Sequence, residues 1–132
     1  MLQIWVKLCL LALLFGAGNV SAQQTVTEAK IFLQSSRLAG FRYHEGRKLW
    51  PQLQVGDKLG LVREVDNPYD ANAIRIEWQG HKLGYVPRAE NAALARFMDH
   101  GQLLDARITA LPKQRPRGRR IEFDVYLENY KE

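Results

Sequence analysis

The sequence has little cysteine and no group of residues spaced as metal ligands. Its 132 residues contain one cysteine, Cys9. The three histidines, His44, His81 and His100, share no zinc-ligand spacing and have no cysteine partners nearby. We therefore expect no zinc site.

Calcium is a weaker interpretation of the acidic stretch 66–72. Asp66, Asp70 and Asn72 carry hard oxygen donors, but their spacing is not that of an EF-hand loop and no closing glutamate follows. The sequence predicts no metal and no cofactor.

Catalytic motifs are also missing. The chain has no GxSxG, no HExxH, no P-loop and no glycine-rich nucleotide turn. Ser35 and Ser36 have no identifiable base partner. We expect a protein without catalytic residues; a degradative enzyme is the least favoured class, since paired carboxylates and a metal set are absent.

Residues 1–22 have the pattern of a signal peptide. Lys7 precedes the apolar run 8–15, and Val20-Ser21-Ala22 is a small-residue cleavage site. The run is shorter than the roughly 20 residues of a membrane span, so we expect cleavage after Ala22, with an uncleaved N-terminal anchor as the alternative. Cleavage removes Cys9 and excludes disulfides and thiol catalysis. The expected location is the periplasm or the outside of the cell, with no stable membrane span left.

The chain carries a net positive charge with or without its first 22 residues. The net charge is +5 and the isoelectric point about 9.6. Removing Lys7 leaves 18 basic against 14 acidic residues, a charge of +4. This balance favours a polyanionic partner.

Alternating apolar residues predict a β-rich domain. In the stretch 57–86, two apolar runs flank the turn 66–70, and Gln79-Gly80 favours a hairpin into a third strand. Further strands are expected over 29–34, 103–111 and 121–127. Residues 48–53 predict a helical turn, and residues 88–100 a helix with a buried stripe that ends at Gly101.

The central stretch resembles the HIRAN domain. The matching motifs are Asp57-x-Leu-x-Leu61, Arg63-Glu64, Asn67-Pro-Tyr-Asp-Ala-Asn-Ala-Ile74 and Leu83-Gly-Tyr-Val86. The resemblance covers about residues 29–127. It implies a mainly β fold with minor α, a small OB- or SH3-like barrel of about six strands with one or two helices. It also implies DNA binding, as in the helicase-like DNA translocases that carry this module. We expect a leader over 23–28, the domain over 29–128 and a tail over 129–132.

The resemblance assigns five DNA-binding residues. Tyr43 would stack on a terminal nucleobase and Arg42 would meet the backbone, since Gly40-Phe41-Arg42-Tyr43 matches the family pattern. Asp70 would accept a hydrogen bond from the 3′-hydroxyl, Tyr69 would stack, and Asn67 would shape the pocket. An ionised carboxylate accepts from a hydroxyl but repels a 3′-phosphate, which favours single-stranded DNA with a free 3′ end.

Two further contacts are expected. Tyr85 stands where the family often has a polar ring, although a half-buried strand residue is the plain alternative. The basic stretch 113–120 is this chain's own feature, and Lys113, Arg115, Arg117 and Arg119 fall at alternate positions. They suit a phosphate backbone, with anionic lipid or solubility as alternatives.

A rival function stays open. An exported chain could use the same barrel rim to bind a protein, a glycan or an anionic lipid of the cell envelope. In either case we expect a monomer.

Overall fold

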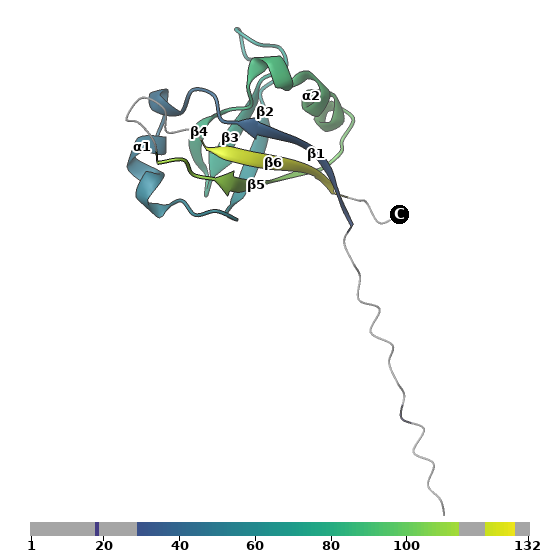
Figure 1. Cartoon of the computed structure of the whole chain (residues 1–132). Helices are drawn as coiled ribbons and strands as arrows, with labels where there is room; N and C mark the ends of the chain where they lie inside the picture. Colours follow the sequence, from purple (N-terminus) through teal and green to yellow (C-terminus); the bar gives the residue numbers. More distant parts are fainter. Residues whose placement is uncertain (1–17, 19–28, 114–120, 129–132) are drawn as a thin grey trace, which may run out of the picture.

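The computed structural model describes Gly18 and residues 29–113 and 121–128, and it has six strands in those ranges (Figure 1). The strands are β1 (Lys30–Arg37), β2 (Lys58–Arg63), β3 (Ile74–Trp78), β4 (His81–Tyr85), β5 (Leu104–Ala110) and β6 (Glu122–Glu128). The helices are α1 (Gly46–Leu49) and α2 (Ala92–Asp99). Three short 3-10 turns complete the order: η1 (Phe41–Tyr43), η2 (Trp50–Gln52) and η3 (Arg88–Glu90).

All six strands belong to one antiparallel sheet with the order β1-β6-β5-β2-β3-β4. The outer strands meet at one bridge, where Ala39 and Tyr85 exchange two backbone hydrogen bonds of 2.9 Å. The sheet is therefore curled like a barrel without a continuous closing ladder. This confirms the expected mainly β, barrel-like fold class.

Strand β3 forms as its sequence predicts. Ile74, Ile76 and Trp78 are buried, and the residues between them are half-buried. Gln79 and Gly80 both have positive φ, 47° and 81°. Two such residues in a row make a type I′ turn, whose twist matches the flanking strands.

The core fills the inside of the curled sheet. Phe123 and Val125 of β6 are fully buried. Leu94 of α2 joins the same cluster. Phe41 is buried with its ring edge-to-face on Trp50, at a centroid distance of 5.6 Å. The two short α-helices thus cover the sheet rather than form a layer of their own (Figure 1).

Two predicted elements differ from the structure. The helix expected over 88–100 is divided into η3 and α2, with the buried Asn91 between them. The first strand, expected over 29–34, begins at Lys30 and runs on to Arg37. In the described ranges no helix has both the length and the apolar character to cross a membrane.

Candidate nucleic-acid interface

The turn between β2 and β3 is held together by its own polar side chains. The side-chain oxygen of Asn67 accepts hydrogen bonds from the backbone N–H groups of Tyr69 (2.9 Å) and Asp70 (3.1 Å). Its amide donates to Glu64 at 3.0 Å. This is an Asx turn, and the pocket-shaping role expected of Asn67 stays a prediction.

Asp70 is fixed by one bond at each carboxylate oxygen. Oδ1 accepts from the backbone N–H of Asn72 at 2.9 Å, and Oδ2 from the side-chain amide of Asn91 at 2.8 Å. Asn91 is 1% exposed, so the carboxylate is anchored to the start of α2.

Tyr69 and Tyr43 are the most exposed aromatic side chains among the described residues. Their relative exposures are 85% and 70%. The Arg42 guanidinium lies 4.7 Å from the centre of the Tyr43 ring and donates to the Tyr43 hydroxyl at 2.6 Å. Both tyrosines thus present free ring surface, and one of them carries a cation on its other face.

Tyr85 is half-buried and its hydroxyl is fully used. The hydroxyl donates to Glu64 at 2.9 Å and accepts from Lys82 at 2.6 Å. The Lys82 ammonium lies 4.5 Å from the centre of the ring, and His44 packs on the ring edge-to-face. All of these Tyr85 contacts are within the domain, and a contact of Tyr85 with DNA stays a prediction.

Glu64 joins these parts into one network. Its carboxylate accepts from Asn67 and Tyr85 and from Arg75 at 2.9 Å. Burial alone would raise the pKa of Glu64, but hydrogen bonds from Asn67, Tyr85 and Arg75 outweigh it and lower the pKa. Burial and the nearby Lys82 ammonium lower the pKa of His44. At neutral pH the rim therefore carries an ionised Glu64 and a neutral His44.

The network connects the two predicted stacking residues through the sheet. Tyr43 lies in η1, which follows the Ala39–Tyr85 bridge. A chain of hydrogen bonds runs from the Tyr85 hydroxyl to Glu64, from Glu64 to the Asn67 side chain, and from Asn67 to the backbone N–H of Tyr69. The segments 40–43 and 64–70, far apart in sequence, are thus held by one set of contacts.

The basic stretch is only partly described. Lys113 is exposed, whereas Arg115, Arg117 and Arg119 lie outside the described residues. Two cations that were not among the predicted site residues, Lys82 and Arg88, flank Tyr85 at three residues on either side. Their regular spacing around a candidate contact residue could have identified them. No group of three or more His, Cys, Asp or Glu side chains suited to a metal occurs within residues 29–113 and 121–128.

Comparison with known proteins identifies relatives of this domain. The sequence model of the HIRAN domain matches residues 31–129. A crystal structure of a Lactobacillus plantarum protein is 33% identical, with a TM-score of 0.69, over 77% of this chain and 99% of that one. The crystal structure of the HIRAN domain of human HLTF is 20% identical, with a TM-score of 0.58, and the match covers 74% of this chain and 78% of that chain. At this identity the similarity supports the fold and nothing further.

Among curated proteins, the helicase-like transcription factor of Oryctolagus cuniculus is 36% identical over 64 residues. The match takes in 48% of this chain and 6% of that protein. The similarity thus concerns one small module of a far longer relative.

Proposed function

Because this chain belongs to the HIRAN domain family, we propose that it binds single-stranded DNA and recognises the 3′-hydroxyl end. HIRAN domains are DNA-binding domains. The observation that carries the proposal is the pair of exposed tyrosines, Tyr43 and Tyr69, held on connected segments of one rim. Stacking of a base on such a ring contributes about 1–3 kcal/mol and tolerates any sequence.

Asp70 supplies the selectivity for the end of the strand. A carboxylate offers about four acceptor positions, and two of those on Asp70 are taken by Asn72 and Asn91. The remaining ones suit a ribose hydroxyl. A 3′-phosphate in the same place would meet a negative charge, at a cost of about 1 kcal/mol or more at 4 Å.

The cations of the rim would bind the backbone. Arg42 already lies on the Tyr43 ring, so a base stacked on the free face would bring its phosphate near the guanidinium. Lys113 and the arginines 115, 117 and 119 would add salt-dependent contacts. If residues 1–22 act as an export signal, the ligand would be DNA outside the cytoplasm.

Fluorescence anisotropy of residues 23–132 tests the proposal. The labelled ligands are matched single strands ending in a 3′-hydroxyl or a 3′-phosphate, and a blunt duplex, each at low and high salt. We expect tighter binding of the 3′-hydroxyl strand, and Asp70→Asn should reduce that preference about fivefold or more as the repulsion is removed. Val65→Ala, in the same loop and 63% exposed, is the control that should change nothing.

Other outcomes would contradict the proposal in distinct ways. Equal, salt-sensitive binding of all three ligands would mean that charge alone acts and that the 3′ end is not read. No binding at low salt would exclude DNA and leave the rim to a protein, glycan or lipid partner.

A further inference from the structure

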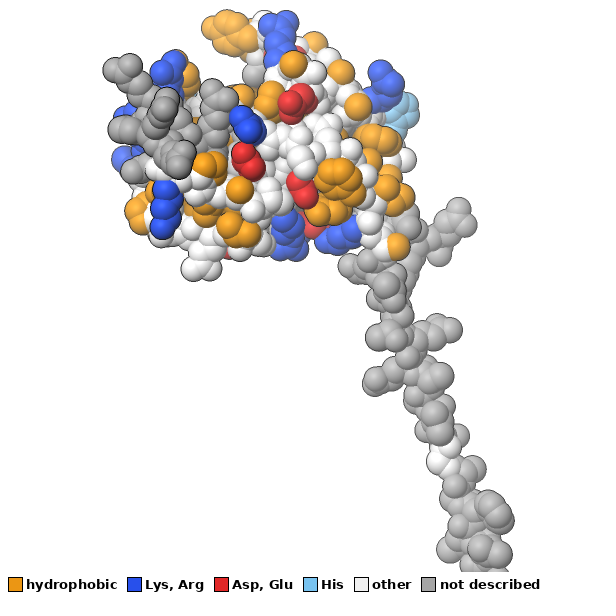
Figure 2. Space-filling view, viewed as in Figure 1, with side chains coloured by type: hydrophobic (Ala, Val, Ile, Leu, Met, Phe, Trp, Pro, Cys, Tyr) orange, Lys and Arg blue, Asp and Glu red, His pale blue; other side chains and the backbone are white. Residues whose placement is uncertain are grey.

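The cations of this domain fall into two sets according to their partners. Every Lys and Arg side chain of β1, β2, β3 and β5 in the described ranges forms an ion pair with an acid: Lys30, Arg37, Lys58, Arg63, Arg75 and Arg107. Figure 2 shows these signs interspersed over the outer face of β1, β6 and β5. That face is close to neutral and offers little to a polyanion.

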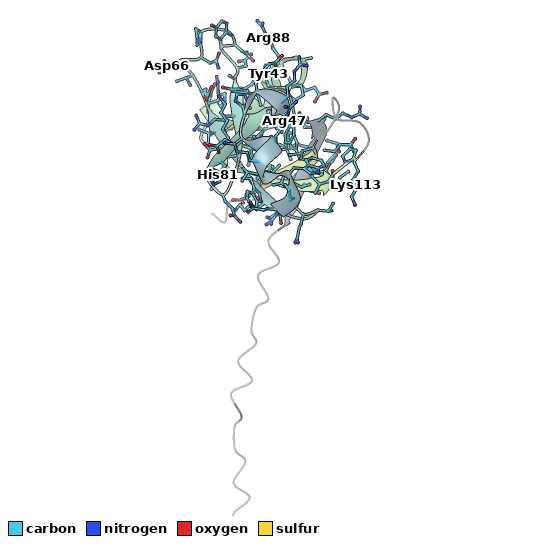
Figure 3. All side chains as sticks on the ribbon, turned by 90° about the vertical axis from the view of Figure 1, so that its left-hand side faces the viewer. Tyr43, Arg47, Asp66, His81, Arg88 and Lys113 are labelled. Carbon is cyan, nitrogen blue, oxygen red and sulfur yellow. The ribbon has the colours of Figure 1, made fainter. Side chains whose placement is uncertain are left out.

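The second set, without an ion pair in the described ranges, lies on η1, α1, β4 and η3, apart from Arg96 of α2 and Lys113 after β5. Within the described residues, Arg47 and Lys48 of α1 and Arg88 of η3 are exposed and form no ion pair. Arg42 and Lys82 contact tyrosines rather than acids. Figure 3, which turns the side with α1 to the viewer, labels Tyr43, Arg47 and Arg88 along it. This side keeps its positive charge.

The acid that precedes α1 in the sequence contacts another element. Glu45 precedes Arg47 by two residues, but its carboxylate contacts the His81 ring of β4 at 2.7 Å. Its backbone N–H also bonds to the carbonyl of Lys82 at 3.3 Å. The acid thus ties α1 to the sheet and leaves the cations of α1 unpaired.

The helix is also held close to the candidate rim. Gly46 packs so tightly on Phe41 that a Cβ there would overlap the ring. Phe41 belongs to η1, next to Arg42 and Tyr43. Because α1 is packed on both η1 and β4, the backbone that carries Arg47 and Lys48 is held against the turn that contains Tyr43.

We propose that Arg47 and Lys48 form a second phosphate-binding site, which holds the backbone of a DNA strand upstream of its 3′ end. This inference rests on the proposed function: the terminal base lies at Tyr43 and the strand continues over α1. The site recognises phosphate charge and no base. It lengthens the bound segment and makes affinity depend on strand length and salt.

The test compares short and longer strands with a 3′-hydroxyl. For a strand of about ten nucleotides, within the range of OB-type barrels, the slope of log affinity against log salt should fall by about 0.7 in Arg47→Ala and again in Lys48→Ala. Affinity for a dinucleotide should not change. Arg96→Ala removes an exposed cation of α2 that has no ion pair within the described residues, and it should leave the salt slope for either strand unchanged.

The outcomes separate this inference from the proposed function. Wild-type slopes in the double variant, with normal binding of the strand end, would overturn the second site and keep end recognition. Loss of dinucleotide binding in the same variant would also overturn it, because the cations would then belong to the end site. If the wild type binds neither strand, the proposed function fails first.

Discussion

The side-chain amide of Asn91 donates a 2.8 Å hydrogen bond to a carboxylate oxygen of Asp70. One residue is buried at the start of α2, and the other lies in the exposed turn between β2 and β3. Arg63 makes a second connection, since its guanidinium contacts Asp99 near the end of α2 and the carbonyls of Ala71 and Ala73. The turn is thus supported at both ends of one helix.

Asn91→Ala should therefore weaken both stability and end recognition. The variant removes a buried hydrogen bond to a carboxylate, and we expect the free energy of unfolding to fall by about 1–3 kcal/mol. The preference for a 3′-hydroxyl should fall with it, because Asp70 loses its orientation. Urea unfolding and anisotropy measure the two effects. Asn72→Ala is the matched control, since within the described part of the chain Asn72 bonds to Asp70 through its backbone N–H alone; a loss of equal size there would contradict this assignment.

Glu64→Gln should be more damaging than Glu77→Gln. Glu64 accepts from three side chains, whereas Glu77 accepts only from Arg75 among the described residues. An amide cannot accept at both ends, so the first variant should lose about 1–2 kcal/mol of stability and release Tyr85. Thermal unfolding of both variants makes the comparison. Equal melting temperatures would show that the network contributes nothing beyond one ion pair.

Gly84→Ala should disrupt the bridge between the outer strands. A Cβ at Gly84 would overlap the Ala39 carbonyl oxygen, so the edges must separate at a cost of about 1–3 kcal/mol. Gly60→Ala is the control in β2, where the nearest atom would be 3.8 Å away. That variant should keep or slightly raise the stability. A stable Gly84→Ala protein with intact amide protection at Ala39 would refute this view of the bridge.

Acid should remove a stabilising contribution from Asp105. Burial would raise its pKa, but the hydrogen bond from Lys30 and the charges of Arg107, Lys30 and Lys58 outweigh it and lower the pKa below 3.8. A depressed pKa in the folded state stabilises the fold above the unfolded value. That stability is lost as pH falls from 3.8 through the folded pKa.

Urea unfolding as a function of pH checks this prediction with Asp105→Asn. The variant should be less stable at neutral pH, because three cations lose their acid, and its stability should fall less steeply on acidification. Asp66→Asn, which changes an exposed loop carboxylate, should follow the wild-type curve. A wild-type acid slope in Asp105→Asn would place the sensitive carboxylate elsewhere.

The meander of β2, β3 and β4 could be predicted from the sequence because its information is local. Alternation gave the strands, and Gln79-Gly80 gave the turn. Fold class followed from the motif in residues 57–86. The division of the helix at Asn91 was not predicted; Asn91 is buried there and its side chain bonds to Asp70, 21 residues earlier. The periodicity of apolar residues indicates which face of an element is buried, but it does not indicate hydrogen-bond partners that are distant in the sequence.

The candidate site shows the same limit. The sequence motif named Tyr43, Tyr69 and Asp70, and the structure finds both rings exposed and the carboxylate anchored. The pairing of Lys82 with Tyr85, and the contact that directs Glu45 to His81 rather than to the cations of α1, depend on how strands and turns pack. Charge counts from the sequence averaged the paired and unpaired cations into one basic total.

Because β1 pairs with β6, the first strand can join the sheet only after the last strand has been synthesised. Lys30 pairs with Glu128 and Arg37 with Glu122, so β1 has no ladder partner until the last strand exists. The meander closes short loops, whereas this ladder must close one that spans nearly the whole domain, and such contacts form late. A chain still on the ribosome can therefore protect the amides of β3 but not those of β1. Pulse-labelled hydrogen exchange would see β3 protected first.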